Sequence, residues 1–169
     1  MTWFEALILG IIQGLTEFLP ISSSGHLELG KAILDTSISQ SLLFTVVVHG
    51  ATVLSIIVVF WKDMASLVID VLKFEWNAST RYMIRILVSM VPILIVGVFF
   101  KEQVEALFVG NLVLVGVMLI ITAGLLALAY FYNPSNKPIT NKSAFIVGIA
   151  QALAVMPGIS RSGATISTG

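Results

Sequence analysis

An apolar stretch followed by a serine-rich turn occurs twice in this chain, and this duplication restricts the folds open to it. Residues 10–26 and residues 148–164 align without a gap at an offset of 138. Each copy is an apolar run, then a proline, then a Ser/Gly cluster. The identical pairs are Gly10/Gly148, Ile11/Ile149, Gln13/Gln151, Leu15/Leu153, Ile21/Ile159, Ser22/Ser160, Ser24/Ser162 and Gly25/Gly163. Duplicated polar loops in an otherwise apolar chain are typical of a binding site at the interface between two repeats.

The composition indicates a membrane protein built from helices. The mean hydropathy is +1.02, and only 11% of residues are charged, against about 25% in soluble domains. The apolar runs are longer than barrel strands and show no alternation. A net charge of zero argues against nucleic acid as a partner. Cysteine is absent, which excludes disulfides and thiolate chemistry. The first residues lack the basic region of a signal peptide, so we expect no cleaved leader.

Three segments are long enough to cross a bilayer, which takes about 20 apolar residues. We expect these spans at 42–61, 82–100 and 110–132. Residues 3–19 and 143–156 are shorter, carry polar side chains and run into proline and serine, as broken or re-entrant helices do. The fold class we expect is therefore an all-α integral membrane protein, an inverted-repeat helical bundle whose broken helices carry the duplicated motif.

The basic residues suggest an orientation. They concentrate in residues 62–85 and 133–142, which the positive-inside rule places in the cytoplasm, with 35–41 outside. If residues 3–34 enter and leave the membrane on the outer side, the two motif copies are inverted and their serine clusters meet near mid-membrane. If residues 3–19 span the membrane fully, the copies are parallel. The sequence leaves both arrangements open.

A carboxylate lies at the end of the first apolar run. An ionised Glu17 at membrane depth costs at least ~2.5–3.5 kcal/mol, so we expect it to face the protein interior beside a partner. Gln13 lies four residues earlier, on the same helical face. The alternative is a polar pair that only joins two helices. We favour a functional role, because ionisable groups within a membrane usually have one.

The first serine cluster combines hydroxyls with an imidazole. Ser22, Ser23 and Ser24 precede Gly25 and His26. A helix beginning here would offer free N–H groups to an anion. A serine nucleophile would find an acid or base within one turn. The alternative is an N-cap cluster with a structural histidine.

The second copy adds an arginine. Arg161 lies among Ser160, Ser162 and Thr165, and its planar fork of donors matches phosphate oxygens. Snorkelling toward an interface is the alternative. His49, in the middle of the first span, either lines the site or bonds a neighbouring helix, and we assign it no chemistry. Together these groups suit phosphoryl transfer to or from a lipid-attached phosphate.

Both motifs resemble those of the undecaprenyl-diphosphatase family, also called the bacitracin-resistance proteins. The first resembles its (Glu/Gln)-x-x-x-Glu motif and the segment that follows, through Gln13, Glu17, Pro20, Ser22, Ser23, Gly25 and His26. The second resembles its later motif, through Pro157, Gly158, Ser160, Arg161, Ser162 and Thr165. Other members carry glutamate where this chain has Gln13. The resemblance covers the whole chain.

The resemblance implies a bacterial inner-membrane enzyme that hydrolyses undecaprenyl diphosphate to undecaprenyl phosphate and inorganic phosphate. This would recycle the carrier lipid of peptidoglycan and other wall polymers and confer bacitracin resistance. It implies a divalent cation, Mg²⁺ or Ca²⁺, and a site toward the periplasmic side. The expected partners are the polyprenyl diphosphate lipid, the bilayer and, as a further option, a second copy of the chain as a homodimer.

We assign roles to the motif residues as a hypothesis. Ser23 is our first choice as nucleophile, with His26 as general base and acid. His26 as nucleophile is the close second. Glu17, helped by Gln13, would orient the histidine or hold the metal ion. Substrate phosphate would be bound by Arg161 and the hydroxyls of its loop, which makes the expected substrate-binding residues Gln13, Ser22, Ser160, Ser162 and Thr165.

Two other functions compete with hydrolysis. A flippase or secondary transporter suits inverted repeats with broken helices equally well, whereas a purely structural membrane subunit would leave Glu17, His26 and Arg161 unexplained. The family's chains continue past the second motif. We therefore expect a single, incomplete membrane domain, with the first repeat at 1–132 and the start of a second at 143–169. We expect residues 1–169 alone to be poorly folded and inactive.

Overall fold

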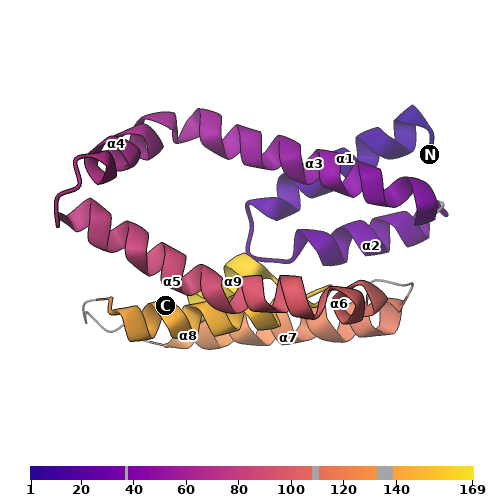
Figure 1. Ribbon diagram of the computed structural model, residues 1–169. Coiled ribbons are helices and arrows are strands. Elements are labelled where there is room, and N and C mark those ends of the chain that lie inside the picture. Colours follow the sequence, from indigo (N-terminus) through magenta and orange to yellow (C-terminus); the bar gives the residue numbers. More distant parts are fainter. Residues whose placement is uncertain (37, 108–110, 133–138) are drawn as a thin grey trace.

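The computed structural model describes residues 1–36, 38–107, 111–132 and 139–169, and no strand occurs among them. Figure 1 shows long helices that run back and forth. The N-terminus lies in the upper part of this view and the C-terminus in the lower part. The helices are α1 (Trp3–Glu17), α2 (Ser23–Ile33), α3 (Ile38–Val59), α4 (Trp61–Leu72), α5 (Ala78–Phe99), α6 (Lys101–Leu107), α7 (Leu112–Phe131), α8 (Asn141–Leu153) and α9 (Arg161–Thr168).

The sequence duplication extends to the starts of the helices. Thr2 and Thr140, 138 residues apart, each cap a helix through a capping box, α1 and α8 respectively. Ser22 and Ser160 have the same spacing. Each accepts a hydrogen bond from the third backbone N–H of the next helix, that of Gly25 in α2 and that of Gly163 in α9. Such caps satisfy N–H groups that a helix leaves unpaired at its start, so the two copies begin their helices at equivalent residues.

The two serine loops differ in where their backbone turns. Gly158 has a φ of +95°, whereas in the first copy Ser22 has a φ of 67°. The position equivalent to Gly158 is Pro20, whose ring holds φ near −65°. The first loop therefore places its left-handed residue two positions later.

The two copies are inverted. In Figure 1, α1 runs from right to left and α8 from left to right. Their loops also make a reciprocal contact. A Cβ on Gly25 would lie 3.0 Å from the Gly158 Cα, and a Cβ on Gly163 would lie 3.0 Å from the Pro20 carbonyl oxygen. Gly163 is the equivalent of Gly25, and Gly158 that of Pro20, so the contact has the self-complementary form of a two-fold interface. The inverted arrangement is confirmed.

Two helices, α5 and α7, are long and apolar enough to cross a membrane, and their bounds lie within a few residues of the expected spans. The expected span at 42–61 needs correction. Its helix ends at Val59, and residues 43–59 form with α4 a pair bent by 77°, either a broken span or a re-entrant loop. Lys62, Asp63 and Asp70 lie in α4, just beyond the bend.

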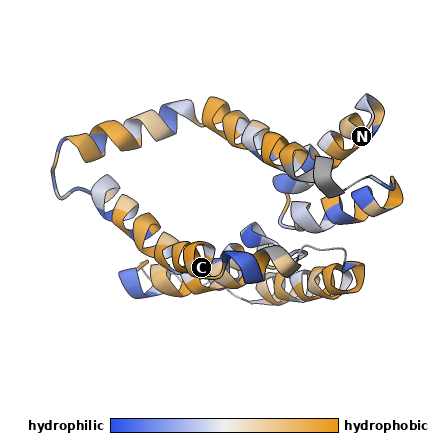
Figure 2. Cartoon of the chain, turned by 45° about the vertical axis from the view of Figure 1, so that its right-hand side comes forward, coloured by the Kyte–Doolittle hydropathy of each residue, from blue (hydrophilic) through white to orange (hydrophobic). Residues whose placement is uncertain are grey.

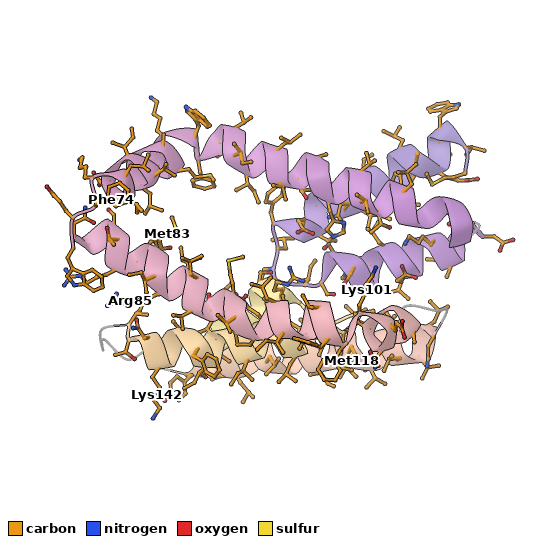
Figure 3. All side chains as sticks on the ribbon, in the orientation of Figure 1. Phe74, Met83, Arg85, Lys101, Met118 and Lys142 are labelled. Carbon is orange, nitrogen blue, oxygen red and sulfur yellow. The ribbon has the colours of Figure 1, made fainter. Side chains whose placement is uncertain are left out.

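The surface of these helices is apolar where a soluble protein would be polar. Figure 2 shows hydrophobic residues along most of the length of the long helices. Only 6% of the apolar window of α5 and 11% of that of α7 are buried inside the chain. Figure 3 shows Arg85 and Lys142 at one end of the helices and Lys101 toward the other. This separation agrees with the two sides assigned from the basic residues, and the protein is an all-helical integral membrane protein.

Candidate functional site

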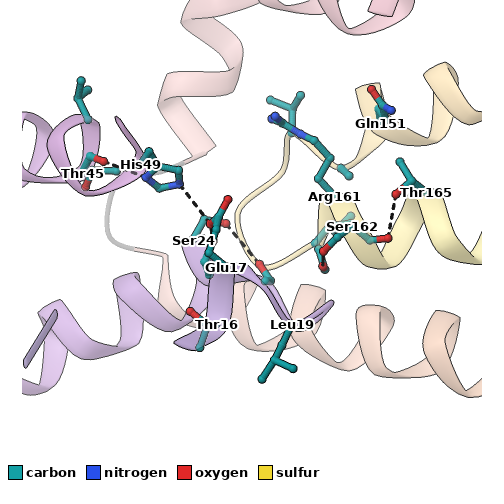
Figure 4. Close-up of a pocket in the computed structure, with 17 residues that line it drawn as sticks. Thr16, Glu17, Leu19, Ser24, Thr45, His49, Gln151, Arg161, Ser162 and Thr165 are labelled. Carbon is teal, nitrogen blue, oxygen red and sulfur yellow. Dashed lines mark hydrogen bonds and ion pairs between the residues drawn. The ribbon is translucent and has the colours of Figure 1, made fainter. Parts of the chain in front are cut away.

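A cavity of about 710 Å³ lies where the two serine loops meet. Its walls come from the end of α1, the first serine loop, α3, the end of α8 and the second serine loop, and Figure 4 shows these side chains around the opening. Seven of the predicted site residues line it, namely Glu17, Ser22, Ser23, Ser160, Arg161, Ser162 and Thr165. Two predicted residues, Gln13 and His26, lie outside the lining.

Glu17 forms the polar centre of the first half of the cavity. Its Oε2 accepts hydrogen bonds from Gln13 Nε2, at 2.8 Å, and from the Ser23 hydroxyl. Gln13 is buried to 1% exposure, directly beneath the carboxylate on the same face of α1. Its Oε1 is a buried acceptor without a partner among the described residues. The expected pairing of these two side chains is present, and it places a carboxylate in contact with the candidate nucleophile.

His26 is placed differently from the expectation. Its Nδ1 lies 2.8 Å from the Ser22 carbonyl oxygen. A carbonyl only accepts, so Nδ1 carries the proton and donates it. No hydrogen bond between His26 and Ser23 occurs in the described part of the chain; the Ser23 hydroxyl donates to Glu17 instead. The structure therefore offers Glu17 as the proton acceptor for Ser23, and a catalytic role for His26 stays a prediction.

Two hydrogen bonds join the second serine loop to α7. The Thr122 hydroxyl donates to the Gly158 carbonyl, at 2.9 Å, and accepts from the Ser160 N–H, at 3.0 Å. Thr122 is 3% exposed, so these bonds are shielded from water and costly to lose. Sequence reasoning missed this residue, because one threonine in an apolar run carries no signal of its own.

Serine hydroxyls in both loops already form hydrogen bonds with their own loop or with the start of the next helix. Besides capping α9, Ser160 shares a hydrogen bond with Ser162 at 3.1 Å. Ser22 shares one with Ser24 at 3.3 Å in the equivalent position. The capped N-termini of α2 and α9 both lie at the cavity. Helix dipoles and free N–H groups there favour an anion. Direct contact of Ser22 or Ser160 with substrate stays a prediction.

The charges suit a phosphate ligand. Among the described lining residues, Glu17 is the one carboxylate and Arg161 the one guanidinium or ammonium group. Arg161 is exposed and has no hydrogen bond or ion pair within the described chain, so its fork is open to a ligand. Thr165 donates to the Ser162 carbonyl at 2.9 Å, one turn into α9. The cavity can therefore hold an anion between a guanidinium and two helix ends.

His49 and Gln151 are among the further lining residues that were given no role from the sequence. His49 reaches the cavity from α3, with its Nε2 3.9 Å from Glu17 Oε2. Gln151 reaches it from α8. Its identity with Gln13 in the repeat was a usable signal, whereas the position of His49 depends on how α3 packs against α1.

Comparison with known proteins agrees with these motifs. The family model described as "Bacitracin resistance protein BacA" matches residues 6–169. An undecaprenyl-diphosphatase of Bacteroides fragilis is 56% identical over 170 residues, which cover 100% of this chain and 64% of the relative. One of Christiangramia forsetii is 59% identical over 99% of this chain and 64% of the relative. One of Methanosphaera stadtmanae is 40% identical over 98% of this chain and 65% of the relative. The chain spans slightly less than two thirds of the length of these relatives.

Proposed function

The chain belongs to the bacitracin resistance protein BacA family, and on that premise we propose that it forms the catalytic pocket of an undecaprenyl-diphosphatase. The reaction would convert undecaprenyl diphosphate and water into undecaprenyl phosphate and inorganic phosphate. One observation carries the proposal. Ser23, whose hydroxyl donates to the Glu17 carboxylate, lines the same cavity as Arg161, whose guanidinium has no partner within the described residues. Two helix N-termini meet at this cavity. The names of the relatives supply the substrate.

The geometry supports a covalent route. Ser23 Oγ attacks the terminal phosphorus while its proton passes to Glu17 Oε2. The bond from that phosphorus to the bridging oxygen breaks, and undecaprenyl phosphate leaves with the electron pair. Water then attacks the phosphoserine, which releases inorganic phosphate and restores the hydroxyl. His26 as general base and acid, or as the nucleophile itself, is the competing assignment.

The opposite wall would bind the phosphate oxygens. Arg161 offers two parallel N–H donors, which stabilise charge that builds up in the transition state. Hydroxyls of Ser162 and Thr165 line the same wall. Ser22 and Ser160 contribute by capping the helices that present backbone N–H groups. Catalysis would then depend mostly on position and charge, as phosphoryl transfer requires.

A divalent cation is part of the proposal. No group of three or more His, Cys, Asp or Glu side chains that could hold a metal occurs in the described residues. The oxygen donors that are present fit Mg²⁺ or Ca²⁺, which accept carboxylate, amide and phosphate oxygens. Glu17, which lines the cavity, would hold the ion together with the diphosphate. The ion would neutralise phosphate charge.

The cellular setting follows from the same premise. The protein is a multi-pass membrane protein. We place it in the bacterial inner membrane with the cavity toward the periplasm, because the basic residues favour that orientation. Recycling of the carrier lipid would serve peptidoglycan and cell-wall synthesis and confer bacitracin resistance. A homodimer stays a prediction.

A phosphate-release assay tests the proposal. Purified protein of the relatives' length, beginning with these residues, is mixed in detergent with polyprenyl diphosphate and Mg²⁺ or Ca²⁺. We expect free phosphate, and we expect Glu17→Gln and Ser23→Ala to abolish its release. A flippase is the alternative, supported by the inverted repeats. It would move lipid between leaflets of a vesicle and release no phosphate in detergent. If His26→Gln abolishes release and Glu17→Gln does not, Glu17 is not the group that receives the Ser23 proton.

A further inference from the structure

The second copy of the duplicated motif lacks the two groups that pair in the first. At the repeat offset of 138, Val155 takes the position of Glu17. Arg161 takes the position of Ser23. Both replacements line the cavity. The first half of the cavity therefore holds a carboxylate and the hydroxyl bonded to it, whereas the equivalent positions of the second half hold an apolar side chain and a guanidinium.

A glutamine that precedes these positions is the same in both copies. Gln13, in α1, corresponds to Gln151, in the last turn of α8. Gln13 Nε2 donates to the Glu17 carboxylate at 2.8 Å. The equivalent acceptor for Gln151 would come from residue 155, and a valine side chain has none. The Gln151 side chain forms no hydrogen bond within the described chain, so its amide lacks the partner that the Gln13 amide has.

The two glutamines also differ in their access to the cavity. Gln13 is 1% exposed and lies outside the lining, whereas Gln151 is half-buried and belongs to it. Figure 4 shows Gln151 on the same side of the cavity as Arg161 and Thr165. An amide in this position is open to a ligand, and a ligand that excludes water from it must accept its hydrogen bond or lose affinity.

The surroundings of Gln151 favour an anion as that ligand. The described lining residues of the second copy, from Gln151 to Thr165, include Arg161 and no carboxylate. The helix α8 ends at Leu153, beside the cavity, and the backbone at a helix C-terminus presents carbonyl oxygens, which repel an anion. A side-chain N–H is therefore the group through which α8 can contact a phosphate.

We propose that Gln151 is a substrate-binding residue whose Nε2 donates a hydrogen bond to a phosphate oxygen, beside the fork of Arg161. The inference rests on the proposed function, which places the diphosphate in this cavity. Gln151 neither gives nor receives a proton, so it contributes to binding rather than to bond cleavage. The two equivalent glutamines then differ in role: Gln13 holds the carboxylate Glu17, and Gln151 holds the substrate.

Steady-state kinetics of phosphate release measure this contribution. In protein of the relatives' length, Gln151→Leu should raise KM about 10- to 100-fold, the loss expected when one hydrogen bond to a charged group is removed. The kcat should change little, because a contact made equally to substrate and transition state affects KM alone. Gln103→Leu, the same change at an exposed position of α6 outside the cavity, is the control. A normal KM in Gln151→Leu would overturn the proposal.

A second variant, Gln151→Glu, tests whether the amide acts through its N–H. The carboxylate keeps the shape of the amide, but it has no N–H to donate and it repels phosphate. We expect KM to rise at least as much as in Gln151→Leu. If Gln151 only filled space, the glutamate would fit better than the leucine. If its Oε1 held a cation, the carboxylate would hold that cation more tightly. A KM in Gln151→Glu below that of Gln151→Leu therefore contradicts the proposed bond.

A binding measurement decides the contact without any turnover. A prenyl methylenediphosphonate carries carbon in place of the bridging oxygen and cannot be hydrolysed there. Calorimetric titration in detergent with Mg²⁺ should give a Kd about 10- to 100-fold higher for Gln151→Leu than for the wild type, and an unchanged Kd for Gln103→Leu. Equal Kd values for the wild type and Gln151→Leu would overturn the inference. If the wild type releases no phosphate from polyprenyl diphosphate while the Kd values differ, the proposed function fails and the phosphate contact stands.

Discussion

Gly25 lies against Gly158, with room for no more than a hydrogen between the first turn of α2 and the second serine loop. A Cβ on Gly25 would approach the Gly158 Cα to 3.0 Å and a Leu119 methyl to 3.1 Å. The reciprocal contact joins Gly163 to Pro20. The two halves of the cavity therefore meet through two close contacts, each of which has a glycine on one side.

Gly25→Ala should force the loops apart. Overpacking of this kind costs about 1–3 kcal/mol, and the displaced loop would carry Ser23 away from the phosphate site. We expect a lower thermal unfolding midpoint in detergent and a larger loss of phosphate release than stability alone explains. Gly124→Ala is the control, because a Cβ there meets no atom within 4 Å. Equal behaviour of the two variants would contradict the close contact.

Replacement of Arg161 should abolish nearly all phosphate release, even when the new residue is lysine. Arg161→Ala removes the fork that lines the cavity and should abolish nearly all turnover. Arg161→Lys keeps a charge but loses the paired donors, so it should not rescue activity. Initial rates of phosphate release at saturating lipid measure both. Arg81→Ala, on the exposed first turn of α5, is the control. Full activity of the lysine variant would show that Arg161 does not bind phosphate through two donors.

Thr122→Val should loosen the second serine loop. The change keeps the side-chain shape but leaves the Gly158 carbonyl and the Ser160 N–H buried without their hydroxyl partner. Each unsatisfied group costs about 1–3 kcal/mol. We expect a lower unfolding midpoint together with a higher KM, since the loop carries Arg161. Ser89→Ala, which removes a hydroxyl bonded only within α5, serves for comparison. A normal KM would mean that the loop keeps its shape without the bond.

Gly10 and Gly148 are equivalent in the repeat but should differ on substitution. A Cβ on Gly148 would collide with the Ser89 carbonyl oxygen of α5, and it would lie 3.0 Å from the ring of Pro92. A Cβ on Gly10 meets nothing within 4 Å. In a thermal-unfolding measurement on protein of the relatives' length, Gly148→Ala should therefore destabilise strongly and Gly10→Ala should not. Equal losses would show that another helix covers Gly10.

Much of the fold was determined by the sequence, because it depends on local chemistry. Capping residues such as Thr2 and Thr140 satisfy N–H groups of their own helices, and a long apolar run crosses a bilayer whatever its neighbours are. The repeat likewise predicted that two serine loops form one site. The same local reasoning extended the first span to residue 61, because hydropathy does not register the bend that follows Val59.

The partners within the site were decided only by the tertiary structure. Ser23 and His26 are close in sequence, yet Ser23 donates to Glu17, and His26 turns back to the Ser22 carbonyl. Thr122 reaches the second serine loop from α7, and His49 approaches Glu17 from α3. Such contacts join residues that are far apart along the chain, so they depend on how whole helices pack. A single sequence records which side chains are present, and the packing of the helices selects the ones that meet.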